Sequence, residues 1–390
     1  MDNSRSRAQP VIRRRLYVLG GFDPRGAGQF QRLLFEQLQH HPLAGGRLQR
    51  ERRGGDTQHS RWRTWDPRQP DAALEIVTLH WDDLVRRQWP RHGATLLREG
   101  AWLYSRYLTG GVLPLGLRLS RRAGFTLLWP LVFVLAWGAL VGAVAWAVLV
   151  AAGSAWPGVA LGLGVCTGLI WLGCHEADRR RISWLFRSIR YTDRLARGLD
   201  GGLLERLEHQ RQLLLAIEQN DPATDVVVLG HSCGTYAAAM LAAGLKRDPR
   251  AQPVMPRLRL LTLGQNLIHL AGLSEANSFR DDLHTLAAAP ELPWLDVSSL
   301  DDWISGAGVN PYELPHLRKP LQPYPEQRVV PLRQRLGLRS RWSLLNNQFR
   351  LHFQYFHAVP AGIDCGGFDL IDDLLAEVVR SEVPQLLDCG

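Results

Sequence analysis

Lysine is nearly absent from this sequence, although the chain is basic. Only Lys246 and Lys319 are lysines among its 46 basic residues, and the formal net charge is +9. Because so strong a bias toward arginine can follow from genome composition, we interpret only the sign of the charge. A basic chain can bind nucleic acid or lie against an anionic membrane surface. A long uncharged segment, described below, favours the membrane.

Cysteine is scarce too, and its pattern excludes a disulfide framework. The five cysteines form an odd set without a CxxC pair, and two of them lie in an apolar segment. This usage predicts a reducing compartment and argues against a structural zinc site. The first ten residues, MDNSRSRAQP, lack the apolar core of a signal peptide, so we expect no export.

Several ligand-binding patterns are missing as well. The sequence lacks GxxxxGK[ST] and GxGxxG, which cradle phosphates in nucleotide-binding folds. His175-Glu176 lacks the second histidine of the HExxH zinc motif, and the acidic cluster at 369–373 is typical of a solvated helix face. We therefore predict no cofactor and no metal site.

Positions 125–174 contain no charged residue. The first part, 125–152, exceeds the roughly 20 apolar residues that a membrane span requires. After the break GSAWPG, a shorter and more glycine-rich apolar stretch follows at 159–174. Because soluble cores rarely run this long without charge, the segment predicts a transmembrane hairpin of two helices.

Arginine clusters flank this segment on both sides. They are Arg118, Arg121 and Arg122 before it, and Arg179, Arg180 and Arg181 after it. By the positive-inside rule both flanks lie in the cytoplasm, so we expect both termini and the polar parts of the chain there. The arginine run at 13–15 is also interpreted as membrane-flanking charge. We therefore predict the lipid bilayer as a partner, and no nucleic acid.

Strand and helix patterns alternate along the rest of the chain. Strands are predicted at 16–21, 75–81, 225–230, 256–264 and 292–299, and helices at 30–39, after 234 and within 182–219 with a break near 198–202. Positions 44–72 are expected to be a polar loop. This alternation predicts an α/β fold in which helices cover both faces of a mostly parallel sheet.

We expect one α/β domain that the hairpin interrupts. Its predicted parts are a disordered basic tail at 1–15, the first part of the domain at 16–120, the hairpin at 121–181 and the second part at 182–390. The nucleophile, the acid and the histidine discussed next all belong to the second part.

Positions 230–234, GHSCG, match the G-x-S-x-G pattern of a nucleophilic serine. The motif follows the strand DVVVLG and opens a helix of small residues, which is the setting that this chemistry requires. A serine at a strained turn between strand and helix needs neighbours without bulk, and Gly230 and Gly234 supply them. Ser232 is therefore the candidate nucleophile. His231 is expected to pack against the turn or tune it.

A nucleophilic serine needs a histidine base and an orienting acid, which follow it in the order acid, then histidine. Asp301 and Asp302 lie just beyond a predicted strand, and we favour Asp302. Of the later histidines, we prefer His352 to His357. Asp296 lies within the strand, and His269 and His284 precede the acid.

An oxyanion hole requires two backbone N–H groups. One is expected from Cys233, which follows the nucleophile. The other is expected from Phe22, because Gly20 and Gly21 in the loop after the first strand let the backbone approach a substrate.

Together these motifs resemble the α/β-hydrolase superfamily in its lipase and esterase branches. Within it, the chain is similar to a group of bacterial membrane proteins with a G-[FY]-D-P-R-G opening, a segment like His80-Trp81-Asp82-Asp83, and a two-helix membrane insertion before the elbow. The resemblance implies an α/β-hydrolase fold and a bacterial inner membrane. It places the acid at Asp302, beyond a Trp-x-Asp stretch, and the histidine at His352, after a Phe-Arg pair.

The expected activity is cleavage of an ester or thioester through an acyl-enzyme on Ser232, Asp302 and His352, with a lipid ester as one candidate substrate. An acyltransferase or thioesterase could use the same triad. A catalytically inactive, membrane-tethered scaffolding module is the alternative from another class. A transporter built on the hairpin is disfavoured, because neither apolar segment contains an ionisable residue in its core.

Overall fold

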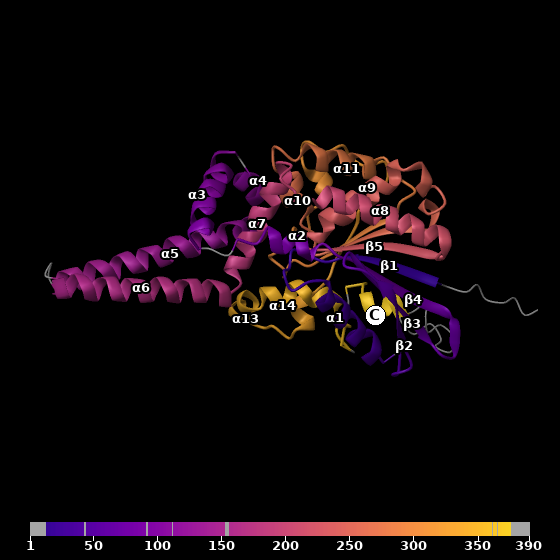
Figure 1. The fold of residues 1–390 in the computed structure, drawn as a ribbon, viewed down its shortest axis with the longest axis horizontal. Helices are drawn as coiled ribbons and strands as arrows, with labels where there is room; N and C mark the ends of the chain where they lie inside the picture. The colour runs from indigo at the N-terminus through magenta and orange to yellow at the C-terminus, as the bar shows by residue number, and fades with distance from the viewer. Residues whose placement is uncertain are drawn as a thin grey trace, which may run out of the picture. The chain divides into compact units, whose positions relative to one another are not determined.

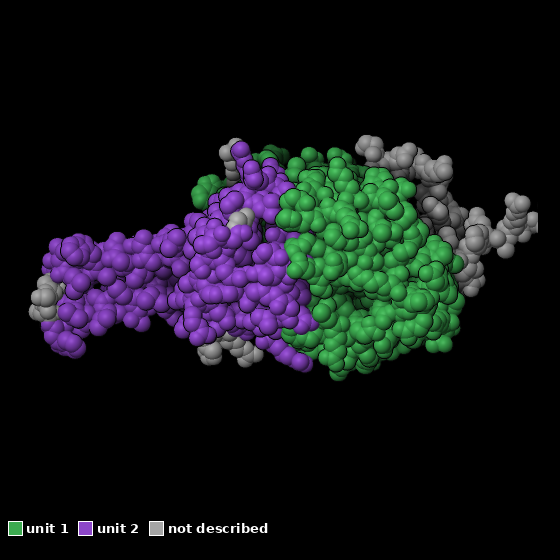
Figure 2. Space-filling view, turned by 90° about the horizontal axis from the view of Figure 1, so that it is seen from above, with its two compact units in different colours: residues 1–86, 201–268, 277–390 green, residues 87–200, 269–276 purple. Residues whose placement is uncertain are grey.

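The computed structural model describes residues 13–375 except 43, 91–92, 111, 153–155, 361 and 365. The chain divides into two compact units, which Figure 2 colours separately. Unit 1 comprises residues 1–86, 201–268 and 277–390, and unit 2 comprises residues 87–200 and 269–276. Most of the tail predicted at 1–15 lies outside the described residues, but positions 13–15 belong to a strand.

An eight-stranded sheet lies at the centre of the described part of unit 1, in the order β2-β3-β4-β1-β5-β6-β7-β8 (Figure 1). The strands are β1 (Arg13–Leu19), β2 (Gln49–Gly55), β3 (His59–Asp66), β4 (Gln69–Leu79), β5 (Asp225–His231), β6 (Leu258–Leu263), β7 (Trp294–Ser298) and β8 (Glu326–Val329). The strands from β4 to β8 in this order pair in parallel, and β3 and β2 continue the sheet antiparallel. The predicted α/β class with a mostly parallel sheet is confirmed.

Helices cover both faces of this sheet. Figure 1 shows α8 (Leu203–Asn220), α9 (Gly234–Arg247) and α11 (Asn277–Ala287) on one side, and α1 (Ala27–His40), α13 (Arg341–Asn346) and α14 (Gln348–Phe353) on the other. The central strands are apolar at successive positions, as strands buried on both faces are. In β1, Leu16 and Val18 belong to the core cluster that α1 enters through Phe30 and Leu34. The remaining described helices of this unit are short: α12 (Leu332–Arg335) and α15 (Leu370–Leu375), with α2 (Asp82–Arg87) and α10 (Leu267–Ala271) at its boundary.

One loop prediction for unit 1 is wrong, and one strand of its sheet was missed. The expected loop at 44–72 contains β2, β3 and the first residues of β4. These strands pair through their backbones, and β2 is exposed and charged, as edge strands that avoid aggregation often are. Strand β8 was not predicted from the sequence either.

The arginine run at 13–15 does not flank a membrane span, because these residues form the start of β1. Arg15 is 1% exposed, and its guanidinium contacts Glu75 and Glu218 at 2.6 Å each and Asp221 at 3.0 Å. Arg14 is buried beside Asp225. Sequence patterns report charge, but only tertiary contacts decide that such charges are paired and buried.

The described part of unit 2 is helical. It contains α3 (Gly93–Thr109), α4 (Val112–Leu119), α5 (Arg121–Ala152), α6 (Trp156–Arg179) and α7 (Ile182–Ala196). The segments Gly124–Ala151 and Trp156–Arg179 are long and apolar enough to cross a membrane, and the most apolar part of the first is entirely exposed. They pack against each other, and the indole N–H of Trp137 donates to the carbonyl of Leu169 at 2.9 Å. These two inserted helices could therefore form a membrane hairpin.

Candidate active site

Ser232 occupies a sharp turn between β5 and α9. Its φ is +56°, a left-handed backbone conformation that residues other than glycine rarely adopt. A Cβ at Gly230 would lie 2.7 Å from the Cβ of Ala238, and one at Gly234 would overlap the carbonyl oxygen of Leu19. Both glycines of the motif are therefore sterically required. Backbone strain of this kind is typical of functional sites, where the surrounding structure holds the turn.

The loop after β1 lies directly against this turn. A Cβ at Gly21 would lie 2.9 Å from the Cβ of Ser232. The indole N–H of Trp81 donates to the carbonyl of Gly20 at 2.9 Å and so holds the loop. Phe22, which follows, is fully buried. The structure thus brings the loop that carries Phe22 next to the turn that carries Ser232 and Cys233.

The sheet order explains why these two loops meet. After β1 the chain passes through α1 and forms β2, β3 and β4 on one side of β1, whereas β5 pairs with β1 on the other side. The carboxyl ends of β1 and β5 therefore form the point at which the strand order reverses. In open α/β sheets, ligands bind at such switch points.

Asp302 and His352 form a buried pair. The Oδ2 atom of Asp302 lies 2.8 Å from Nδ1 of His352, and both side chains are 0% exposed. The hydroxyl of Tyr355 donates to the same Oδ2 at 3.1 Å, and the N–H of Ile304 donates to Oδ1 at 3.2 Å. With Nδ1 donating to the carboxylate, the imidazole has its Nε2 as the proton-accepting atom.

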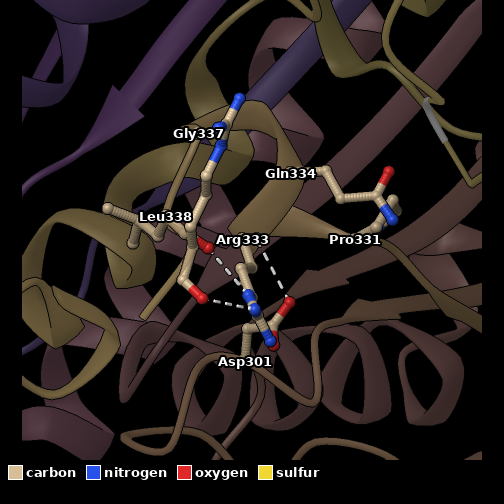
Figure 3. Close-up of a pocket in the computed structure, with 7 residues that line it drawn as sticks. Asp301, Pro331, Arg333, Gln334, Gly337 and Leu338 are labelled. Atoms are coloured by element: carbon tan, nitrogen blue, oxygen red, sulfur yellow. Dashed lines mark hydrogen bonds between the residues drawn. The ribbon is translucent and has the colours of Figure 1, made fainter. Parts of the chain in front are cut away.

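The two alternative residues lie elsewhere. Asp301 lies on the wall of a separate surface pocket of about 510 Å³ (Figure 3). Its Oδ2 accepts from the N–H of Arg333 at 3.1 Å, and the Arg333 guanidinium donates to the backbone oxygens of Leu338 and Arg339. His357 is half-buried, and its Nδ1 lies 3.3 Å from the carbonyl of Phe353. The geometry therefore pairs His352 with Asp302.

His231 connects the serine turn to the histidine segment. Its Nε2–H donates to the carbonyl of His352 at 2.7 Å, and the two imidazole rings lie 4.8 Å apart. Phe30 and Phe356 pack against the His231 ring. Burial, and secondarily the neighbouring His352, hold the pKa of His231 well below its usual range. His231 is therefore uncharged at neutral pH, and it packs between the serine turn and the segment that carries His352.

Asn266 is a site residue that the sequence did not reveal. It is 4% exposed, and its Nδ2 lies 3.5 Å from Oγ of Ser232 and 3.9 Å from Sγ of Cys233. It follows β6, the strand beside β5, and Gly264 with φ of +52° turns the chain toward the site. The signal in the sequence was the position of Asn266. A polar residue directly after the strand next to the nucleophile's strand is a candidate for the site.

Asp296 lies within β7, as expected, and is not part of the pair. It is fully buried, and the hydroxyl of Thr262 on β6 donates to its Oδ1 at 2.7 Å. Burial raises its pKa to about 7, so the carboxyl titrates near neutrality rather than staying charged.

No family model, curated protein or solved structure matches this chain. Among the residues that the structure describes, no group of three or more His, Cys, Asp or Glu side chains could hold a metal ion. The geometry of the site is therefore the basis for any functional assignment, and the catalytic roles of its residues stay predictions.

Proposed function

We propose that this chain is a membrane-anchored serine hydrolase with an α/β-hydrolase fold, which cleaves an ester or thioester through an acyl-enzyme. One observation carries the proposal: Ser232 adopts a left-handed conformation on a G-x-S-x-G turn between a buried strand and a helix. A glycine-rich turn alone has no need to hold a serine in this conformation. A nucleophile does, because the strained turn lifts its hydroxyl above the end of the sheet.

The order of the other residues supports the same assignment. The turn with Ser232 follows β5, Asp302 follows β7 and His352 follows β8, so all three lie beyond the carboxyl ends of parallel strands. This is the chain order of nucleophile, acid and histidine in α/β hydrolases. The buried pair of Asp302 and His352 supplies an oriented base whose carboxylate stabilises the imidazolium.

The proposed reaction has two halves. Ser232 Oγ attacks the carbonyl carbon while its proton passes to Nε2 of His352, and Asp302 stabilises the resulting imidazolium through Nδ1–H. His352 then protonates the leaving alkoxide or thiolate, which departs as the acyl-enzyme forms. In the second half, water gives its proton to His352 and attacks the acyl group, and Ser232 regains the proton as the carboxylic acid leaves.

The oxyanion of each tetrahedral intermediate needs preorganised donors. We assign the backbone N–H groups of Phe22 and Cys233 to this role, because their two loops meet at Ser232. We add the side chain of Asn266, whose amide nitrogen is 3.5 Å from Oγ. An amide at this distance can reach an oxygen that develops negative charge beside the serine.

The inserted helices bear on the class of substrate. A hairpin that spans a membrane would tether the chain to the bilayer, and acyl lipids and lipid-derived esters are abundant esters there. Ser232 is 2% exposed and His352 is fully buried. In this structure both groups are therefore largely shielded from water.

The test is hydrolysis of p-nitrophenyl esters and of phospholipids by the full-length protein in nanodiscs. We expect Ser232→Ala to lower kcat at least about 10³-fold, because the nucleophile is lost. Asp301→Ala is the matched control and should retain the wild-type rate.

Three other outcomes would redirect the proposal. Equal rates for wild type and Ser232→Ala would contradict a serine hydrolase. Transfer of the acyl group to an added alcohol or amine, in preference to water, would indicate an acyltransferase on the same triad. A folded wild-type protein with no turnover of any ester or thioester would instead favour a scaffolding module.

A further inference from the structure

Unit 2 contains a pocket of about 320 Å³ that basic side chains surround. The pocket lies between α3 and α7. Its lining residues are Arg98, Glu99, Trp102 and Leu103 from α3, Arg190, Asp193 and Arg194 from α7, and Arg197, which directly follows α7. Four guanidinium groups therefore share the pocket with two carboxylates. The excess of positive charge indicates an anionic ligand.

Two of the four arginines are already paired. The guanidinium of Arg190 contacts both carboxylate oxygens of Glu99, and Arg197 contacts Asp193 at 2.8 Å. These pairs place both carboxylates of the pocket opposite cations. The other two arginines, Arg98 and Arg194, form no ion pair of their own with any described residue, so the pocket keeps an excess of positive charge.

Arg194 illustrates this excess. Its Nε donates at 3.1 Å to the side-chain oxygen of Gln88, which is a neutral partner. Among the described residues, no carboxylate lies within ion-pair distance of Arg194 or Arg98. Burial, followed by repulsion from Arg190 and Arg197, lowers the pKa of Arg194. An anion in the pocket would relieve this repulsion.

The apolar wall of the pocket is aromatic. The guanidinium carbon of Arg197 lies 4.5 Å from the centre of the Trp102 ring, and that of Arg106 lies 4.9 Å from it. Trp102 is nevertheless 45% exposed, and its neighbour Leu97 on the same helix is 61% exposed. A tryptophan between arginines and exposed apolar side chains is typical of a membrane interface.

The position of the pocket within unit 2 is also consistent with a membrane interface. Helix α7 follows α6 after a turn at Arg181, whose φ is +60°, and Figure 1 shows α3 and α7 lying across the base of the hairpin. Both α5 and α6 contact α7. If the hairpin spans a membrane, the arginine pocket lies on the side of the bilayer where the flanking arginines are.

We propose that this arginine pocket binds the phosphate group of an anionic ligand, either a lipid headgroup or a soluble phosphate compound. Phosphate oxygens match the fork of several guanidinium groups better than a single carboxylate does. The volume exceeds that of a phosphate ion and falls in the range of small-molecule sites, so the group attached to the phosphate can lie against Trp102 and Leu103. The site does not depend on the chemistry assigned to Ser232.

The variant that tests it is Arg98→Gln/Arg194→Gln, because these arginines have no carboxylate partner whose loss would disturb folding. The matched control is Arg118→Gln/Arg121→Gln, which removes the same charge from exposed arginines outside the pocket. Ester hydrolysis and the thermal midpoint of all three proteins establish that they are folded.

Two probes distinguish the sources of the phosphate. Inorganic phosphate is titrated calorimetrically into full-length protein in a neutral detergent. Separately, native mass spectrometry measures retention of phosphatidic acid against phosphatidylcholine from mixed nanodiscs. We expect at least one probe to bind the wild type and the control about tenfold or more tightly than the double variant.

Loss of phosphate binding in the double variant, without a preference for phosphatidic acid in the wild type, would assign a soluble phosphate compound. Selective loss of phosphatidic acid would assign a lipid headgroup. Equal behaviour of wild type and double variant with both probes would overturn the proposal, and so would an equal loss in the control, because it would reflect net charge alone.

Discussion

The Oδ2 atom of Asp302 lies 2.8 Å from Nδ1 of His352, and both side chains are fully buried. This contact predicts the effect of Asp302→Asn. An amide in place of the carboxylate favours the wrong imidazole tautomer and leaves the imidazolium unstabilised, so we expect kcat to fall by up to about 10⁴-fold. Steady-state ester hydrolysis measures it, with Asp301→Asn as the control. A rate loss in Asp301→Asn that equals the loss in Asp302→Asn would show that the acid is misassigned.

The left-handed conformation of Ser232 predicts how the choice of substitution at this position changes the stability of the protein. With φ at +56°, any residue with a Cβ is strained there, whereas glycine is not. We therefore expect Ser232→Gly to be more stable than Ser232→Ala by about 1 kcal/mol, although both lack the hydroxyl and are inactive. Denaturant unfolding of the two variants in mild detergent tests it. An alanine variant as stable as the glycine variant would mean that the turn is not strained in solution.

Asp296 predicts a pH dependence of stability. Its pKa is raised to about 7 by burial, from the ordinary value of 3.8. Between these values the folded protein holds a proton that the unfolded chain has lost, so the free energy of unfolding falls as pH rises from about 4 to 7. Above pH 7 both states are ionised and this contribution is constant.

Asp296→Asn should remove this slope, which amounts to at most ~1.4 kcal/mol per pH unit. The Thr262 hydroxyl can donate to the new amide oxygen as it does to the carboxyl. The measurement is the difference in unfolding free energy between wild type and Asp296→Asn at several pH values. A difference that stays constant from pH 4 to 7 would place the pKa of Asp296 near its ordinary value.

Arg15 and Arg13 form a matched pair for testing the buried ion network. Arg15 and Glu218 are both almost fully buried, and Arg15→Met removes one of the two guanidinium partners of Glu218, so it should cost about 3–5 kcal/mol. Arg13 pairs with Asp221 where both side chains are about a third exposed, and Arg13→Met should cost less than about 1 kcal/mol. Similar losses in the two variants would contradict the burial assigned to Arg15.

The local parts of the site could be predicted from the sequence, because steric rules over five residues require them. Gly230 and Gly234 flank Ser232 for reasons that hold in any such turn, and a strand and a helix of small residues surround it. The pairing of Asp302 with His352 spans 50 positions. Chain order restricted the candidates to two acids and two histidines, and the resemblance to α/β hydrolases favoured Asp302 and His352 among them.

The features that were missed or wrongly predicted depend on tertiary contacts, which no local sequence pattern encodes. Strands β2 and β3 are held by backbone pairing at a sheet edge, and their charged side chains resemble a loop. Asn266 reaches Ser232 only because β6 lies beside β5. In the sequence, Arg15 resembles a membrane-flanking charge. Its carboxylate partners, Glu75 and Glu218, are distant in the sequence and become neighbours only in the folded chain.

The central claim is that Ser232 is an activated nucleophile, and covalent labelling tests it most directly. Full-length protein in detergent is treated with a fluorophosphonate probe, and the modified residue is located by mass spectrometry of peptides. The account predicts a single adduct on Ser232, absent in Ser232→Ala and formed much more slowly in Asp302→Ala and His352→Ala. An adduct that persists in Ser232→Ala, or no adduct on folded wild-type protein, would contradict it.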